Sequence, residues 1–199
     1  FVESRTVSAN VTTYSNSGLT EGTYCYQVRA YMNNGLTSDY SGPVCAVTLP
    51  VAPRWTSIQT ISESQINLTW GDRSTTESGF VIERCSTADC SDAQLLATLA
   101  ADSTSYEDTN LTADTAYFYR LYAINESGNS AYSSVRGRTT GPNPPTNLTA
   151  TTPLARQITL TWQDNATTEL GFRIERCVRD GCSDFIRLTT AAADATTYN

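Results

Sequence analysis

Large apolar side chains alternate with polar ones along several short stretches of this chain. Ile66, Leu68 and Trp70, for example, are separated by single polar residues. Side chains two residues apart lie on the same face of a β-strand, so this pattern predicts a strand with one face in a core. The segments 80–83 and 117–123 alternate in the same way. No segment keeps the helical period of about 3.6 residues, so the chain is predicted to be all-β with essentially no helix.

Residues that favour tight turns separate the predicted strands. Runs rich in Gly, Asp, Asn and Ser occupy 71–74, 108–110 and 126–129. Such residues tolerate the backbone conformations of turns or bond to their own backbone. Short strands joined in this way are typical of small β-domains whose outer faces are polar.

The chain contains an internal repeat. The run Gly-Phe-Val-Ile-Glu-Arg-Cys that begins at Gly79 returns as Gly-Phe-Arg-Ile-Glu-Arg-Cys from Gly171, an interval of 171 − 79 = 92 residues. Trp70 returns as Trp162 at the same interval. The units of helical solenoids run about 20 to 50 residues, whereas a small β-sandwich takes about 100, so each repeat is expected to form one sandwich.

Cysteine spacing indicates disulfides rather than a metal site. Cys85 and Cys90 recur as Cys177 and Cys182, each pair enclosing four residues. A zinc site needs four ligands, usually two such pairs together or cysteine with histidine, and here each repeat has one pair and the chain has no His. Disulfides imply an oxidising compartment.

Composition excludes several classes of function. The formal net charge is −7, which disfavours nucleic acid and anionic membrane surfaces as partners. No apolar run reaches the length of about 18 residues that a membrane-spanning segment needs. All 13 basic residues are Arg, and His is absent. The commonest general base near neutral pH and any Schiff-base lysine are therefore missing, and we predict that the chain is not an enzyme.

The ordered strand motifs resemble those of the fibronectin type III domain. They are Leu-Thr-Trp ending at Trp70, the run from Gly79, and the stretch 115–123 with Leu111 before it. The pattern Trp-x-Asp-x-x-x-x-Glu-x-Gly-Phe-x-Ile-Glu-Arg, starting at Trp70 and at Trp162, is similar to the version common in bacterial secreted proteins. The resemblance implies tandem immunoglobulin-like β-sandwiches.

Aligned on that family, the chain holds one whole domain and two halves. Residues 51–140 correspond to a complete domain, 1–49 to a C-terminal half and 142–199 to an N-terminal half. Half a sandwich exposes an apolar face and open edges and should not fold alone. We expect an excerpt of a longer tandem array. Head-to-tail assembly, in which 142–199 of one copy join 1–49 of the next, and proteolysis are the alternatives.

The resemblance also assigns structural roles to several side chains. Trp70 and Trp162 are expected to anchor the cores. Tyr24 and Tyr117, each a few residues after a Leu, are expected to bond back to upstream backbone as tyrosine corners. Trp55, near a domain start, is expected to pack on the linker, with an exposed aromatic that contacts a ligand as the alternative.

Cys25 and Cys45 lie on neighbouring strands in the family's fold. Cys25 stands between two tyrosines, so its side chain is expected to point away from the core and to staple the two strands through Cys45. The short loops closed by the other two pairs are expected to stiffen a strand connection, and the alternative is a clamped loop that presents a binding tip.

Acidic residues recur in the loop after each Trp. Asp72 and Glu77 return as Asp164 and Glu169. Turn capping is the expected role. The alternatives are a glycosidase pair, which needs a cleft that a small sandwich does not provide, and weak calcium binding. We predict no catalytic residue, cofactor or dedicated metal site.

These inferences predict an extracellular, secreted or cell-surface protein with a mechanical role: a segment of a tandem-repeat rod, surface fibre or adhesin. Pro-bearing linkers at 48–53 and 141–145 favour semi-rigid spacing. Expected partners are other copies or further repeats, and a cell-surface protein or glycan. The alternative is a spacer or carbohydrate-contacting module of a large secreted hydrolase.

Overall fold

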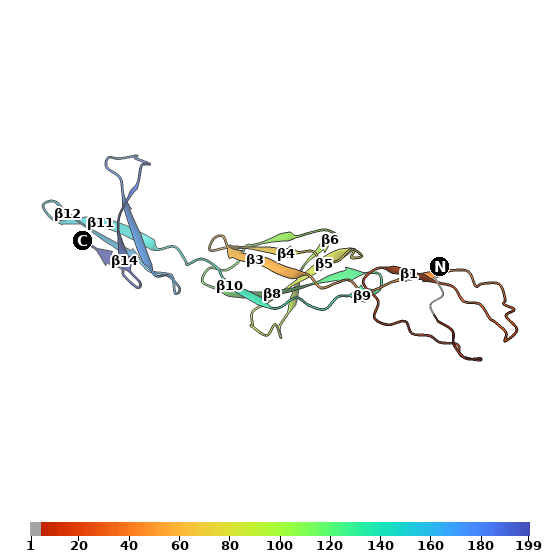
Figure 1. Ribbon diagram of the computed structural model, residues 1–199. Helices are drawn as coiled ribbons and strands as arrows, with labels where there is room; N and C mark the ends of the chain where they lie inside the picture. The colour runs from red at the N-terminus through yellow and green to blue at the C-terminus, as the bar shows by residue number, and fades with distance from the viewer. Residues whose placement is uncertain (1–4) are drawn as a thin grey trace. The chain divides into compact units, whose positions relative to one another are not determined.

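The computed structural model describes residues 5–199, which form fifteen strands and no helix (Figure 1). The described residues form no helix that is long and apolar enough to cross a membrane. The predicted all-β class is confirmed. The strands are β1 Thr23–Tyr26, β2 Val44–Val47, β3 Arg54–Thr60, β4 Gln65–Gly71, β5 Gly79–Cys85, β6 Gln94–Ala100, β7 Ser105–Thr109, β8 Ala116–Asn125, β9 Gly128–Asn129, β10 Arg136–Thr139, β11 Thr146–Leu154, β12 Gln157–Gln163, β13 Gly171–Arg176, β14 Ile186–Ala192 and β15 Thr197–Tyr198.

By their internal contacts the residues divide into two compact units. The first holds the chain up to Ser57 with Thr69–Ser105 and Phe118–Arg136, and the second holds Ile58–Leu68, Tyr106–Tyr117 and Gly137–Asn199. In sheet order, β3-β4-β7 form one sheet and β10-β8-β5-β6 another, with β9 added to β8. The remaining sheets are β1-β2, β11-β12-β15 and β13-β14.

The alternation seen in the sequence places the core. Every second residue of β4 is buried, and Trp70 is only 2% exposed. The Trp70 ring meets Phe80 of β5 with ring centroids 5.9 Å apart, so strands from two different sheets face each other here. The side chains that are fully buried are Ile66, Leu68, Phe80, Ile82, Tyr119, Leu121 and Ala123.

Strand β5 departs from simple alternation, because Val81 is buried although it points away from Phe80 and Ile82. β5 lies between β8 and β6, where Val81 is paired with Tyr122 on one side and Thr98 on the other. Cross-strand partners lie on the same face, so these two side chains flank Val81 on the outer face. A central strand with large neighbours is therefore covered on both faces.

The strands repeat at the interval found in the sequence. Shifting β4 and β6 by 92 residues gives the bounds of β12 and β14, and shifting β5 gives β13 to within one residue. Even the irregularity recurs, since the register shifts between Ile82 and Glu83 in β5–β6 and between Ile174 and Glu175 in β13–β14. The domain limits at residues 49–51 and 140–142 stay a prediction from the sequence.

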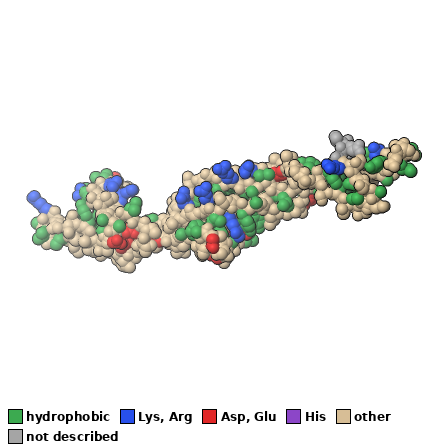
Figure 2. Space-filling view, turned by 60° about the horizontal axis from the view of Figure 1, so that its bottom comes forward, with side chains coloured by type: hydrophobic (Ala, Val, Ile, Leu, Met, Phe, Trp, Pro, Cys, Tyr) green, Lys and Arg blue, Asp and Glu red, His purple; other side chains and the backbone are tan. Residues whose placement is uncertain are grey.

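The corresponding core positions are more open outside the middle of the chain. Ile158 is 59% exposed, whereas its counterpart Ile66 is fully buried. Among the described residues 142–199, the pair β13–β14 has no partner that corresponds to β8. Figure 2 shows hydrophobic side chains distributed over the face that it presents. The strands therefore form where the sequence predicts them, but the apolar faces near both ends of the chain are incompletely covered.

Gly79 marks the closest approach between β5 and β6. A Cβ atom there would lie 2.3 Å from the Leu99 carbonyl oxygen, and at Gly171 it would lie 2.3 Å from that of Ala191. Because backbone must move to relieve this overlap, we expect Gly79→Ala to lower the free energy of unfolding by about 2 kcal/mol or more. Urea denaturation measures this loss.

Gly42→Ala is the matched control, because a Cβ at Gly42 meets nothing within 4 Å. Its effect should stay within about 0.5 kcal/mol. Equal urea midpoints for the two variants would contradict the close approach of β5 and β6.

Candidate functional site

The structure joins all six cysteines in three disulfides. Cys25 faces Cys45 across the β1–β2 pair, with Cα atoms 3.9 Å apart, and the Cys25 side chain is exposed as expected. The other two bridges, Cys85–Cys90 and Cys177–Cys182, close loops of equal length at the ends of β5 and β13.

Polar groups of the loop closed by Cys85 and Cys90 form hydrogen bonds to Asp92, two residues after the loop. The Ser86 backbone N–H and hydroxyl and the Thr87 hydroxyl all donate hydrogen bonds to the Asp92 carboxylate. These bonds hold the pKa of Asp92 well below its usual range. The polar groups around the bridge thus bond to one another, which favours a stiffened connection over a binding tip.

The two predicted tyrosine corners bond back to the chain upstream. The Tyr24 hydroxyl donates to the Thr20 carbonyl oxygen at 3.0 Å, and the Tyr117 hydroxyl accepts the Thr112 backbone N–H at 3.0 Å. Trp70 and Trp162 are both buried. Their indole Nε1 atoms are buried without a hydrogen-bond partner.

Trp55 is buried, which corrects the alternative that it contacts a ligand. Its exposure is 9%, its indole N–H donates to the Ser134 carbonyl oxygen at 2.8 Å, and its ring meets Trp70 edge to face at 6.1 Å. The sequence predicts that Trp55 packs on the linker, with an exposed ring as the alternative; the ring packs instead against Trp70 and bonds to Ser134.

Two groups of three carboxylates recur at the repeat interval. Asp72, Glu77 and Asp102 have oxygens within 4.8 Å of one another, as do Asp164, Glu169 and Asp194. Oxygen donors of this kind suit a hard cation such as calcium. Both first aspartates also cap their turns, because Asp72 accepts the Ser74 backbone N–H at 3.0 Å and Asp164 that of Ala166 at 2.9 Å.

The electrostatics of the first group disfavour ionisation of Asp72. Burial raises its pKa, the Ser74 N–H opposes this, and the neighbouring charges of Glu77 and Asp102 raise it further. One Glu77 oxygen, Oε2, is buried without a partner. The negative charges are therefore held close together at a cost to the fold.

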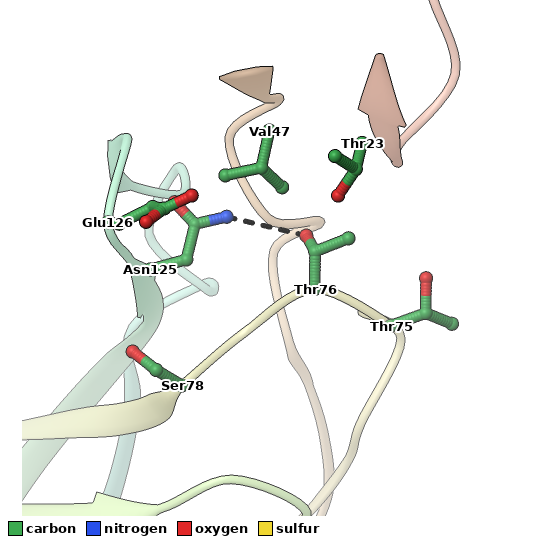
Figure 3. A pocket seen from close by; sticks show the side chains of 7 residues that line it. All are labelled: Thr23, Val47, Thr75, Thr76, Ser78, Asn125 and Glu126. Atoms are coloured by element: carbon green, nitrogen blue, oxygen red, sulfur yellow. Dashed lines mark hydrogen bonds between the residues drawn. The ribbon is translucent and has the colours of Figure 1, made fainter. Parts of the chain in front are cut away.

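A shallow cleft of about 340 Å³ lies beside the loop that follows Asp72, at Thr75 and Thr76 (Figure 3). Its lining is mostly hydroxyl, amide and carboxylate: Thr23, Thr75, Thr76, Ser78, Asn125 and Glu126, with one valine. Asn125 donates to the Thr48 carbonyl oxygen at 2.8 Å, and the Ser127 hydroxyl donates to that of Val47 at 2.6 Å. Polar bonds thus connect residues 47–48 with the turn after β8.

Glu21 bonds to two residues that line this cleft, Thr75 and Thr76, and to Ser74 before them. Its Oε1 accepts the backbone N–H groups of Thr75 and Thr76 at 3.0 and 3.1 Å, the Thr76 hydroxyl at 2.6 Å, and the Ser74 hydroxyl. Burial raises the pKa of Glu21, but these four hydrogen bonds outweigh it and lower the pKa to about 2. Glu21 is therefore ionised at any physiological pH.

Asp114 plays a similar part further along the chain. One carboxylate oxygen accepts the Thr168 hydroxyl, and the other accepts the Asn143 backbone N–H at 2.9 Å and its side-chain amide at 3.0 Å. The hydrogen bonds from Thr168 and Asn143 lower the pKa of Asp114. Sequence reasoning missed both Glu21 and Asp114; their shared place, three residues before Tyr24 and Tyr117, was the available signal.

A family model, described as fibronectin type III domain, matches residues 51–137. This part of the chain is a fibronectin type III domain. Strands β3 to β10 lie within or next to the matched range, so the disulfide Cys85–Cys90 and the first carboxylate group belong to the fibronectin type III domain.

A curated relative is Exoglucanase B of Cellulomonas fimi, which is 32% identical over 192 residues. The match covers 82% of this chain but 16% of that protein, so the chain spans a small part of its relative's length. The chain is thus similar to a segment of a much longer protein that is named as an enzyme.

Two solved structures with weak similarity to this chain are named as a fibronectin type III domain and an Fn3-like protein. The sixth such domain of human fibronectin type III domain containing protein 3 is 21% identical, covering 54% of this chain and 93% of that one, with a TM-score of 0.40. An Fn3-like protein from Clostridium thermocellum is 22% identical, covering 49% and 98%, with a TM-score of 0.41.

We expect loss of the Cys85–Cys90 bridge to destabilise the fold. In the chain-entropy view, closing so short a loop contributes about 2 kcal/mol, so the double variant Cys85→Ala/Cys90→Ala should unfold at lower urea concentration by that amount. Addition of reductant to the parent chain should shift its midpoint in the same direction. A variant with an unchanged midpoint would show that the bridge adds nothing to stability.

Asp72→Asn is expected to stabilise the fold at neutral pH. The folded pKa of Asp72 is raised above its usual value of 3.8, so ionisation of the folded form lowers stability. That loss is absent below the unfolded pKa, grows as pH rises, and is complete above the folded pKa. The gain in the variant should be about 0.2–1 kcal/mol at pH 7, as for a partly screened surface pair.

Thermal melts of both proteins from pH 3 to pH 7 measure this difference. The gain should vanish toward pH 3, where Asp72 is protonated in both states. Asp39→Asn, at an exposed aspartate, is the control and should change little across the range. A gain from Asp72→Asn that does not depend on pH would contradict the electrostatic cause.

Proposed function

We propose that this chain is a non-catalytic extracellular spacer within a larger secreted polysaccharide hydrolase. The observation that carries the proposal is the use of its acidic side chains. Glu21 and Asp114 each accept several hydrogen bonds, from residues 29 to 55 positions further along the chain. A carboxylate that several donors hold in its ionised form suits a structural anchor, because it carries no transferable proton at neutral pH.

The composition supports the absence of catalysis by the segment itself. With neither His nor Lys in the sequence, no Ser–His, Cys–His or Schiff-base pair can be assembled from this chain. The carboxylate groups after Trp70 and Trp162 lie in loops, where a retaining or inverting glycosidase would need two carboxyls in a cleft that encloses a sugar.

The relative supports the hydrolase setting. Exoglucanase B carries a matching segment as 16% of its length, which leaves most of that protein for other parts. Three disulfides in this chain agree with an oxidising, extracellular environment. A spacer of this kind sets the distance, and so the effective concentration, between the parts it joins.

A rod, surface fibre or adhesin is the second candidate. The observation that favours it is the recurrence of strands and disulfide at a 92-residue interval, which suits a long uniform array. The two candidates differ in what else the mature polypeptide contains.

Mass spectrometry and sequencing of the native secreted protein separate the two candidates. A spacer requires a catalytic domain in the same polypeptide. A mature protein made of these repeats alone would overturn the hydrolase proposal and support the fibre.

In that enzyme, replacing residues 51–140 with an equally long Gly/Ser linker tests the spacer role. We expect hydrolysis of an insoluble polysaccharide to fall by about three- to tenfold, because a flexible linker holds the joined parts at a less favourable separation. Hydrolysis of a soluble oligosaccharide should stay within about twofold, since it does not depend on that separation. Unchanged rates on both substrates would contradict the proposal.

A further inference from the structure

The loops after Trp70 and Trp162 each donate hydrogen bonds to one carboxylate: Ser74, Thr75 and Thr76 to Glu21, and Thr168 to Asp114. We call residues 72–78 and 164–170 the receiving loops, and Glu21 and Asp114 the junction carboxylates. We propose that each receiving loop is a carboxylate-binding site for the acidic side chain of the preceding repeat, so that consecutive repeats interlock in a fixed order.

The first receiving loop surrounds a single oxygen with donors. Two backbone N–H groups and two hydroxyls, from Ser74, Thr75 and Thr76, all reach Glu21 Oε1. Successive backbone N–H groups that point at one atom form a concave anion site. All these donors are neutral, so the site recognises a carboxylate by directed hydrogen bonds rather than by an opposite charge.

The second receiving loop repeats the arrangement through one corresponding residue. Thr168 is Thr76 moved by 168 − 76 = 92 residues, and its hydroxyl donates to Asp114 as that of Thr76 does to Glu21. Asn143, in the Pro-bearing linker, adds two more donors to Asp114. The second site therefore fastens the linker as well as the loop.

The junction carboxylates also occupy one position. Glu21 lies 24 − 21 = 3 residues before Tyr24, and Asp114 lies 117 − 114 = 3 residues before Tyr117. Both tyrosines bond back to a Thr just ahead of the acid, Thr20 in the first case and Thr112 in the second. The tyrosine corner thus fixes the turn that presents the carboxylate, and the repeat carries both halves of the contact: an acid before its Tyr and a receiving loop after its Trp.

This pairing specifies which partner fits. The first receiving loop itself contains two acidic residues, Asp72 and Glu77. A further carboxylate is therefore accepted only where the Thr and Ser donors reach it. A turn of a following or preceding repeat that lacks an acid at this position leaves those donors without their acceptor. The partner of each receiving loop is therefore an acid-bearing repeat of the same kind.

Amide hydrogen exchange of the whole 199-residue chain tests the first site. Glu21→Ala should speed exchange of the Thr75 and Thr76 amides by about tenfold, because it removes the acceptor of both N–H groups. Glu126→Ala is the matched control, since Glu126 is an acid that lines the same cleft. The amides of Ile66 and Leu68 report whether the core stays folded.

Exchange that is unchanged in Glu21→Ala, or equally faster in Glu126→Ala, would overturn the proposal. Faster exchange that also includes the core amides would do so as well, because it would indicate general destabilisation. Thr76→Val keeps the backbone donor and removes the hydroxyl; in the double variant with Glu21→Gln, the two effects should be clearly non-additive if the side chains bind each other. Additive effects would count against direct binding.

The second site is tested in the same way at Asn143. Asp114→Ala should expose the Asn143 amide to faster exchange by about tenfold, while Asp180→Ala, the same charge change at an exposed aspartate, should not. A response at Glu21 but none at Asp114 would reject the repeated contact. None of these results depends on whether a catalytic domain is attached; the spacer proposal is tested separately, by the mass and sequence of the native secreted protein.

Discussion

Backbone hydrogen bonds hold β5 against β8 along the whole length Gly79–Cys85, and against β6 on its other side. The ladder does not stop at the strand, because the Ser78 N–H continues it to the Ile124 carbonyl oxygen at 2.7 Å. Two residues earlier in the chain lies Thr76, which bonds to Glu21. Since a side chain can bind well only from a backbone that is already in place, the position of the junction contact follows from the pairing of this central strand.

The same ladder explains why the middle of the chain is better packed than its ends. β8 supplies Tyr119, Leu121 and Ala123 to the buried face, and all three are fully covered. β13 repeats β5, yet within the described part of residues 142–199 no strand takes the place of β8. The free energy gained by burying apolar side chains is proportional to the area removed from water. The middle sandwich therefore holds most of the stabilisation that the strands can supply.

Much of this could be predicted from local periodicity. Residues Ile66, Leu68 and Trp70 announce a strand because the backbone pleat turns every second side chain to one face. Cys85 and Cys90 are close in sequence, so their bridge needs no knowledge of the fold. Trp55 was harder, because its burial depends on Trp70 and on the Ser134 carbonyl, which is 79 positions away. Glu21 and Asp114 were missed for a similar reason. The donors to Glu21, and Thr168 that donates to Asp114, lie more than 50 positions further along the chain, and no pattern within one strand reports contacts between repeats.

The bridge between Cys25 and Cys45 changes how this chain would carry a pulling force. The chain from Cys25 to Cys45, a separation of 20 positions, could extend to about 70 Å when free, whereas the crosslinked Cα atoms are 3.9 Å apart. Tension entering at β1 therefore passes through sulfur to β2 and leaves the intervening loop slack. Stretching the protein in an oxidising medium would lengthen it by that much less, and reduction would release the hidden length in one step.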